Sequence, residues 1–327
     1  MNEVFCGRFY EEIHVESKIL ESAAIFIALI LVNKVDLLAH KQKSDSNFLV
    51  AGVVRNCANH VKSDVKKIQD ALAGVHNVSW LLVESDSDDQ TVEVLKGLKN
   101  EITNFDFMTV GTLRDQMPIR TDRLAYCRNT FLEAIRSQEK YRNIDYVLVS
   151  DFDGMNTHLT PASIDSCWER DDWDVCTANQ DGPYYDVWTI RHPFWSPNDC
   201  YEQYRYMLSL KVRAFVAYYD AVYSRMITIP KNAEWIEVDA AFGGLAIYKR
   251  DAIISSRYAG ITEAGVEICE HVVLSEGIKK AGFSIFLNPR LINTRRSEHI
   301  NKALQNIAAL FLFGKNGPDR LKKLIRR

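Results

Sequence analysis

Short apolar segments alternate with helical patterns along the first half of the chain. Continuous apolar runs predict buried strands at 48–54, 78–83, 105–110 and 146–149. Between these runs, apolar residues recur at helical spacing up to about Leu72, from Thr91 to Leu98 and from about Asp122 to Arg136. Apolar strands joined by helices are typical of parallel sheets, so the pattern predicts an α/β fold, a mostly parallel sheet with helices on both faces.

The second half has a more mixed pattern, because strict alternation ends after Asp153. Strand-like pieces are predicted at Trp173 to Thr177, Tyr184 to Ile190, Leu245 to Tyr248 and Ser284 to Leu287. They flank a long helical segment predicted from about Asp199 to Arg225. No repeat and no Gly/Ser-rich linker divides the chain. One α/β domain with a nucleotide-binding first half accounts for this organisation.

Charge and cysteine content narrow the class of protein. The 327 residues include 40 basic and 43 acidic side chains, for a net charge of −3. A nearly neutral chain lacks the strong positive electrostatic potential that attracts the phosphates of nucleic acid, so we expect no nucleic-acid partner. The seven cysteines are scattered and odd in number. That distribution fits a reducing compartment and predicts a cytoplasmic protein.

The two termini differ in character. The apolar run Ala23 to Val32 has about half of the roughly 20 residues that a membrane span needs, and it predicts a buried or interfacial helix, with a membrane anchor as the alternative. Acidic residues precede the run, which disfavours a signal peptide. At the other end, residues 315–327 contain six basic side chains and one acidic side chain, Asp319. They follow an apolar run at 308–313. This basic helix predicts either peripheral membrane contact or a solvated terminal helix.

The strand predicted at 146–149 ends in Ser150-Asp151-Phe152-Asp153. Ligands of open parallel sheets bind outside the carboxyl ends of the strands. Two residues apart on an extended backbone, the carboxylates of Asp151 and Asp153 point to one side, so one divalent ion can reach both. Mg²⁺ and Mn²⁺ prefer such oxygen ligands and often share them with substrate phosphates. These aspartates are the predicted metal ligands, and the alternative is a turn that caps the next helix.

A second acidic segment, Glu84-Ser85-Asp86-Ser87-Asp88-Asp89, follows the strand predicted at 78–83. The ribose hydroxyls or base N–H groups of a nucleoside would satisfy clustered acids here, as in dinucleotide-binding sheets. We therefore predict that Glu84 and Asp86 contact a nucleotide. The alternative is a turn that caps the helix beginning at Thr91, and the two interpretations are compatible.

Basic residues gather at the start of the helix predicted from Asp122. Arg120 and Arg128 lie eight residues apart, close to two helical turns, so they share a face if the helix begins early. A diphosphate leaving group needs cationic or bidentate donors as charge builds on it. We predict that these arginines and the following Asn129 bind the donor, with ordinary surface arginines as the alternative.

Glu270 and His271 open a further predicted helix. Together they could supply a metal ligand, a general base or an orienting pair. The alternative is a histidine with a structural role, whose hydrogen bonds are made within the fold. His299, in Ser297-Glu298-His299, is a further predicted metal ligand.

Aromatic and polar residues are concentrated between Tyr184 and Trp195. Sugar rings lie on aromatic surfaces while Asp186 and Arg191 can reach hydroxyls, and core packing is the alternative for the aromatics. Gly243-Gly244 predicts either a close backbone approach that leaves room for a donor sugar or a turn.

Taken in order, these segments resemble GT-A glycosyltransferases, and in particular the cryptococcal capsule-associated mannosyltransferase family. The family's Arg-x-x-x-Leu-Ala-x-x-Arg-Asn and Tyr-Asp-x-Trp-x-x-Arg stretches have counterparts at 120–129 and 185–191. The likeness covers about 47–299. It implies a Rossmann-like GT-A domain at 47–300, divided into a nucleotide-binding half (47–153) and an acceptor and catalytic half (154–300). Residues 1–46 would form an N-terminal helical extension and 301–327 a basic C-terminal helix.

The resemblance also implies an activity, the transfer of a hexose from a nucleotide-sugar to a glycan or lipid-linked acceptor in polysaccharide or glycoconjugate synthesis. The implied donor is GDP-mannose, and the implied cofactor is Mn²⁺ or Mg²⁺ held by Asp151 and Asp153, to which our own prediction adds His299. Glu270-His271 stands where many inverting GT-A enzymes have Glu-Asp, and the catalytic residues that we predict are Glu270, His271 and Asp186. The implied donor-binding residues are Asn56, Glu84, Asp86, Arg120, Arg128, Asn129, Gly243 and Gly244. The implied acceptor-binding residues are Tyr185, Trp188 and Arg191.

Two other functions are compatible with the same broad fold. A nucleotidyltransferase of sugar phosphates should carry a Gly-rich phosphate loop after the first strand, where this chain has Arg55-Asn56-Cys57-Ala58-Asn59. A non-catalytic carbohydrate-binding protein would not need the aspartate pair and should bind glycans without metal or nucleotide.

Overall fold

The computed structural model describes residues 41–295 and 298–325, with side chains described except at 298, 299 and from 322 onward. From Gln42 onward the chain forms one compact unit. The predicted N-terminal extension lies outside the described residues except for 41–46, and so does the apolar run Ala23 to Val32. In the part of the chain that is described, no helix is both long and apolar enough to cross a membrane.

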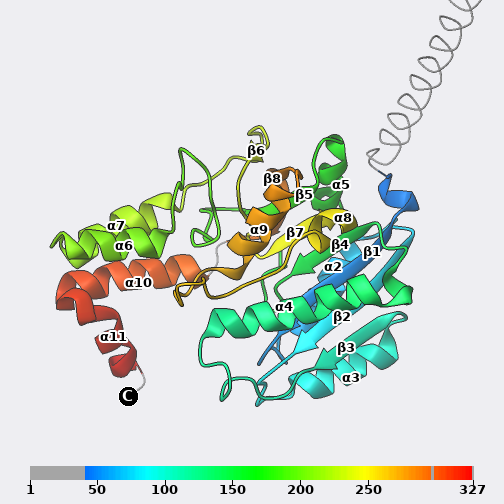
Figure 1. The fold of residues 1–327 in the computed structure, drawn as a ribbon, viewed down its shortest axis with the longest axis horizontal. Coiled ribbons are helices and arrows are strands. Elements are labelled where there is room, and N and C mark those ends of the chain that lie inside the picture. Colours follow the sequence, from blue (N-terminus) through cyan, green and yellow to red (C-terminus); the bar gives the residue numbers. More distant parts are fainter. Residues whose placement is uncertain (1–40, 296–297, 326–327) are drawn as a thin grey trace, which may run out of the picture. The chain divides into compact units, whose positions relative to one another are not determined.

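The described residues form an eight-stranded mixed sheet with the strand order β3-β2-β1-β4-β7-β5-β8-β6 (Figure 1). β1 pairs in parallel with β2 and β4, and β2 pairs in parallel with β3. β7 is antiparallel to both β4 and β5, while β5 and β8 are parallel and β6 is antiparallel to β8. The strands are β1 (Asn47–Val54), β2 (Asn77–Glu84), β3 (Phe105–Thr109), β4 (Tyr146–Ser150), β5 (Val175–Gln180), β6 (Ile236–Glu237), β7 (Leu245–Lys249) and β8 (Ile285–Thr294).

Helices fill the connections. They are α2 (Val61–Ala71), α3 (Thr91–Glu101), α4 (Arg120–Ser137), α5 (Pro161–Asp165), α6 (Cys200–Ser209), α7 (Ala214–Ala221), α8 (Arg250–Ile254), α9 (Glu270–Lys280), α10 (Glu298–Phe313) and α11 (Gly317–Ile325). Short 3₁₀ turns are η1 (Lys43–Asp45), η2 (Glu139–Tyr141), η3 (Ser166–Glu169), η4 (Tyr223–Arg225) and η5 (Gly314–Asn316).

Both faces of the sheet are covered, as the apolar runs predict. Phe48 and Val50 of β1 pack in one cluster with Val65 of α2, whereas Leu49 packs in another with Phe131 of α4. Alternate residues of a strand point to opposite faces, so a continuous apolar run serves two cores at once. In Figure 1, α4 crosses in front of β1 and β2. The expected α/β class with a mostly parallel sheet is confirmed.

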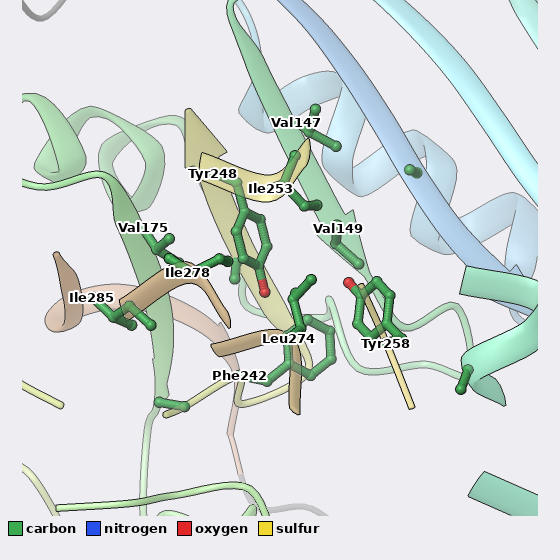
Figure 2. Packing of buried hydrophobic residues seen from close by; sticks show 14 of the residues in the cluster. Val147, Val149, Val175, Phe242, Tyr248, Ile253, Tyr258, Leu274, Ile278 and Ile285 are labelled. Atoms are coloured by element: carbon green, nitrogen blue, oxygen red, sulfur yellow. The ribbon is translucent and has the colours of Figure 1, made fainter. Parts of the chain in front are cut away.

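The second core cluster also fixes the start of α9. Figure 2 shows Leu274 and Ile278 of α9 pointing into the same core as Tyr248 of β7 and Tyr258 of the loop after α8. All four side chains are buried. Because burying a large apolar side chain stabilises a fold by about 1.5–3 kcal/mol, this packing holds α9 beside the sheet.

Two predicted elements of the second half are wrong. The helix predicted from Asp199 to Arg225 is divided into α6 and α7, because Lys211 between them adopts a φ of +62°, which no α-helix accommodates. The strand predicted from Tyr184 to Ile190 is a loop and turn. Tyr184, Val187 and Ile190 are buried as the side chains of a strand would be, yet the backbone of this segment pairs with no sheet neighbour in the described residues.

Candidate active site

A cleft of about 690 Å³ opens where β1, β2 and β4 end. Side chains from the loops after these strands line it, together with the N-terminal turns of α4 and α9. The far wall comes from α6, α7 and α10. This is the place where open parallel sheets bind their ligands.

Asp151 and Asp153 both line this cleft. Between them, Phe152 is 2% exposed and packs on β1 at Gly52, where any Cβ would lie 2.4 Å from the Phe152 ring. The buried ring therefore anchors the loop and leaves the two flanking carboxylates at the cleft. Asp153 is exposed and forms no hydrogen bond or ion pair with another described residue.

Asp151 carries an unusual charge environment. Burial raises its pKa, the Arg128 guanidinium opposes this, and the carboxylates of Asp153, Asp186 and Glu270 add to the rise, to about 7. Its side chain is still 31% exposed, toward the cleft. The cleft thus holds more carboxylate charge around Asp151 than one arginine neutralises.

The backbone of Gly243 and Gly244 holds Asp186 and Asp151 in place. The Gly243 N–H donates to Asp186 Oδ2 at 3.0 Å, and the Asp151 N–H donates to the Gly244 carbonyl at 2.9 Å. Both glycines have positive φ, +69° and +84°. A Cβ on Gly244 would lie 2.6 Å from the Tyr185 hydroxyl. Both are buried and neither is among the lining residues, and their predicted contact with the donor stays a prediction.

Arg128, a lining residue of the cleft, joins two carboxylates. Its Nε donates to Glu270 Oε1 at 3.1 Å and its Nη2 to Asp151 Oδ1 at 3.3 Å. Burial disfavours its charge, yet these two carboxylates raise the pKa of Arg128 above its ordinary value. The guanidinium also lies 5.4 Å from the Phe242 ring centroid and 5.7 Å from that of Tyr258. It is a permanently charged link between β4 and α9.

His271 is buried at the back of the same cleft. Its ring stacks on Phe242 with centroids 3.8 Å apart, and neither ring nitrogen has a hydrogen-bond partner among the described residues. Burial, reinforced by the nearby charge of Arg128, lowers its pKa well below the ordinary value. A neutral imidazole at this position is ready to accept or donate one hydrogen bond.

The predicted arginines come together at α4. The helix begins at Arg120, earlier than the predicted Asp122, so Arg120 and Arg128 both reach the cleft. Arg120 is exposed and forms no ion pair with another described residue. Arg123 also lines the cleft, and its Nε lies 3.7 Å from Asp86 Oδ2. Asn129 does not line it, because both polar atoms of its amide bond to the backbone of Tyr258.

The acidic segment after β2 serves the fold more than the cleft. Glu84 is buried and absent from the lining, since it accepts hydrogen bonds from the Ser87 N–H and the Thr109 hydroxyl. Asp86 does reach the cleft, although its Oδ1 accepts two backbone N–H groups. Asn56, with a φ of +50°, lines the cleft and ties its loop to this segment through Asp88.

Aromatic side chains also line the cleft: the ring centroids of Trp188 and Tyr201 lie 5.5 Å apart, and Tyr185 and Tyr218 are further lining residues. We call this aromatic part of the lining the aromatic end of the cleft. The Trp188 indole donates to Asp199 Oδ2 at 2.8 Å, which leaves its ring fixed. Arg191 donates to the same Oδ2 at 3.1 Å and lies outside the lining. Arg191 and Trp188 thus share one carboxylate oxygen, and the predicted contact of Arg191 with the acceptor stays a prediction.

The lining also includes residues that were not predicted from the sequence, among them Tyr201, Tyr218, Lys302 and Asn306. They come from α6, α7 and α10, which sequence patterning separates from the acidic strand ends. No local signal marks them, because only the long-range packing of α10 on α7 brings them to the cleft.

A divalent cation fits the carboxylates of the cleft. Mg²⁺ and Mn²⁺ favour oxygen donors and are usually bound by one or two carboxylates plus substrate phosphates, which Asp151 and Asp153 match in type and number. The described residues contain no group of three or more His, Cys, Asp or Glu side chains arranged to hold a metal by themselves. The side chain of His299 lies outside the described part of the chain, so its predicted role stays a prediction.

No family model and no curated protein matches the chain. Among solved structures, the mannosyltransferase PcManGT from Pyrobaculum calidifontis in complex with GDP-Man and Mn2+ is similar, at 13% identity and TM-score 0.45, over 94% of this chain and 75% of that one. S. aureus TarS 1–349 in complex with UDP-GlcNAc matches at 12% identity and TM-score 0.41, over 82% and 67%. Mannosyl-3-phosphoglycerate synthase from Rubrobacter xylanophilus matches at 15% identity and TM-score 0.38, over 86% and 76%.

With TM-scores below 0.5, these likenesses carry no argument about activity. The resemblance to the capsule-associated mannosyltransferase family also stays a prediction. The functional proposal rests on the residues of the cleft.

Proposed function

We propose that the protein is a glycosyltransferase that moves a hexose from a nucleotide-sugar to a hydroxyl acceptor with the help of a divalent ion. One observation carries the proposal: Asp151 and Asp153 line a single cleft together with the guanidinium groups of Arg120 and Arg128, at the carboxyl ends of parallel strands. Paired carboxylates and cations side by side suit a metal-bound diphosphate better than a neutral sugar alone.

The donor would lie along the strand ends. Its nucleoside would contact Asn56 and Asp86, and Arg120 would meet the diphosphate. When bound, a divalent ion would neutralise the charge that develops on the diphosphate as the glycosidic bond breaks. GDP-mannose is the donor we favour, on the sequence resemblance.

The acceptor would approach from the aromatic end, over Trp188 and Tyr185. Its hydroxyl oxygen forms the new bond to the anomeric carbon, and the bond to the diphosphate oxygen breaks and gives its electron pair to the nucleoside diphosphate. We assign acceptance of the hydroxyl proton to Asp186, which lines the cleft. Glu270 is 4% exposed and paired with Arg128, so we assign it, with His271, to positioning.

A thermal-shift experiment tests the proposal directly. The protein is heated with UDP, GDP or CMP, each with and without Mn²⁺, and the corresponding nucleotide-sugars are then incubated with it and analysed for released nucleoside diphosphate. We expect one diphosphate to raise the melting temperature only when Mn²⁺ is present, and the matching sugar nucleotide to be consumed. Stabilisation by free glycans alone would instead indicate a binding protein. Pyrophosphate release from a nucleoside triphosphate and a sugar phosphate would indicate a nucleotidyltransferase.

A further inference from the structure

A second hollow, of about 470 Å³, lies between α7 and α10 and is lined by apolar side chains alone. We call it the α7–α10 surface; its lining includes Phe215, Val216 and Tyr219 of α7 with Leu304, Ile307 and Phe311 of α10. Phe311 and the adjacent Leu312 are each 67% exposed, and Tyr219 is 53% exposed. Large apolar side chains gathered on one face in this way mark an interaction surface.

Basic side chains flank this surface where α7 begins and α10 ends. The Phe215 and Phe311 rings meet there, 5.2 Å apart, and η5 contacts α7. Lys211 and Arg213 precede α7, and Lys315 lies in η5. All three are exposed, and none forms an ion pair with another described residue.

The basic character continues into α11. Arg320 is exposed without an ion pair to a described residue, and the sequence beyond it adds Lys322, Lys323, Arg326 and Arg327. Asp319 is the single acidic residue of this stretch. Apolar side chains beside cations without an ion-pair partner complement a surface that has an apolar interior and negatively charged headgroups.

The same two helices also line the cleft, from their other side. Tyr218 of α7 and Asn306 of α10 are lining residues there, and the Asn306 amide donates to the Tyr218 hydroxyl at 3.3 Å. Whatever the α7–α10 surface contacts therefore lies one helix layer away from the aromatic end of the cleft.

We propose that the α7–α10 surface docks on an anionic lipid membrane. The exposed rings and Leu312 enter the boundary between headgroups and acyl chains, while Lys211, Arg213 and Lys315 meet the lipid phosphates. Docking holds the aromatic end of the cleft near the membrane, within reach of molecules carried by lipids. The inference goes beyond the proposed function and does not depend on it, because it rests on a surface outside the cleft.

Vesicle co-sedimentation of the full chain tests the proposal. We expect binding to vesicles of phosphatidylcholine mixed with phosphatidylglycerol, weak binding to phosphatidylcholine alone, and release by salt. The variant Phe311→Asp with Leu312→Asp should bind at least about tenfold more weakly, because two apolar side chains no longer enter the lipid. The matched control is Phe194→Asp, since Phe194 is 93% exposed and lies elsewhere on the chain, and it should bind like the unaltered protein.

A charge-matched pair separates electrostatic from apolar contact. Lys211→Gln with Lys315→Gln should weaken binding to the anionic vesicles by about thirtyfold, at roughly 1 kcal/mol per cation. Lys67→Gln with Lys96→Gln, at exposed positions of α2 and α3, should change it little. Circular dichroism confirms that each variant is folded.

Three results would overturn the proposal. One is vesicle binding that survives the substitutions in α10 and is lost on Ile27→Asp, which would assign the contact to the apolar run near the N-terminus. Another is a chain that binds no vesicle of either composition. The third is a dimer in analytical ultracentrifugation that Phe311→Asp converts to a monomer, which would make the surface an interface between two copies.

Discussion

The two acidic segments that follow β2 and β4 have similar sequences, but their carboxylates differ in whether the fold supplies them with hydrogen-bond partners. After β2, the carboxylates satisfy backbone N–H groups of their own surroundings. Glu84 accepts from the Ser87 N–H at 2.9 Å, and Asp86 Oδ1 accepts from the N–H groups of Leu113 and Arg114, both at 2.9 Å. These carboxylates already accept hydrogen bonds within the fold, although Asp86 also lines the cleft.

After β4, a residue from outside the segment accepts the backbone N–H groups. Asp64 of α2 accepts from the Gly154 N–H at 2.8 Å and from the Asn156 N–H at 3.3 Å, so the turn that follows the aspartates is held from outside. Among the described residues, Asp153 forms no side-chain hydrogen bond or ion pair, and the Asp151 side chain forms its hydrogen bond with Arg128. An acid at a strand end becomes available to a ligand when a different side chain supplies the acceptors that the turn requires.

Removal of Arg128 should have the largest effect on the segment after β4. Arg128→Met leaves Glu270 buried without its cation and Asp151 without its partner. The cost should be about 3–5 kcal/mol in the free energy of unfolding, as for other broken buried ion pairs. Urea denaturation measures it.

Arg120→Met is the matched control, because Arg120 is exposed and its loss should change stability by less than about 0.5 kcal/mol. Equal stability of the two variants would mean that Arg128 does not hold the two carboxylates together.

Asp153→Asn should separate function from stability. If Asp153 is a metal ligand, the turnover of a nucleotide-sugar should fall by about 100-fold or more, because charge on the leaving diphosphate is no longer neutralised. Stability should remain within about 0.5 kcal/mol, because no described residue depends on this side chain. Steady-state kinetics at varied Mn²⁺ concentration measures the first and urea denaturation the second.

Asp171→Asn is the control, at an exposed aspartate outside the cleft. Unchanged turnover in Asp153→Asn, with the same Mn²⁺ requirement, would remove Asp153 from the site.

The segment after β2 should respond in the opposite sense. Asp86→Ala leaves two backbone N–H groups without their acceptor, at a cost of about 2 kcal/mol in the free energy of unfolding. Asp88→Ala, in the same segment, removes only a 3.9 Å ion pair from a side chain that is 71% exposed, and should cost less than about 0.5 kcal/mol. Thermal and urea unfolding of the two variants compare them. A larger loss in Asp88→Ala would reverse our assignment of the two carboxylates.

Local patterning was enough to predict much of the fold. The apolar runs predict β1 to β4 to within two residues at each end, since a buried strand needs little beyond continuous apolar side chains. It failed between Tyr184 and Ile190, because a buried loop has the same composition as a buried strand. It also failed at Lys211, whose positive φ breaks a helix that the spacing of apolar residues would continue.

The candidate site was predicted less evenly. Asp151 and Asp153 line the cleft as expected. Their position depends on local features alone, namely the end of a strand and the alternation of side chains along an extended backbone. Glu84 and Asn129 do not, since their partners, Thr109 and the Tyr258 backbone, come from distant parts of the sequence. Spacing shows which polar groups are near a strand end, but only tertiary packing determines which of them are already hydrogen-bonded.

The smallest effect we predict is a pH dependence in the segment after β2. Burial alone would raise the pKa of Asp86, but the N–H groups of Arg114 and Leu113 and the charges of Arg114 and Arg123 outweigh it and lower the pKa below its ordinary value of 3.8. The folded protein therefore binds a proton here less readily than the unfolded chain does. The resulting stabilisation is complete above the ordinary value and is lost as the pH falls through the lower, folded one.

Urea denaturation of the unaltered protein and of Asp86→Asn over a range of pH measures this contribution. The gap in unfolding free energy should be constant near neutral pH and should narrow as the pH falls below about 4, because the unaltered carboxylate then loses its advantage as an anion. A gap that widens in acid would show that burial, and not the hydrogen bonds, controls this carboxylate. Asp86 would then resemble the crowded acids after β4, and the contrast between the two segments would fail.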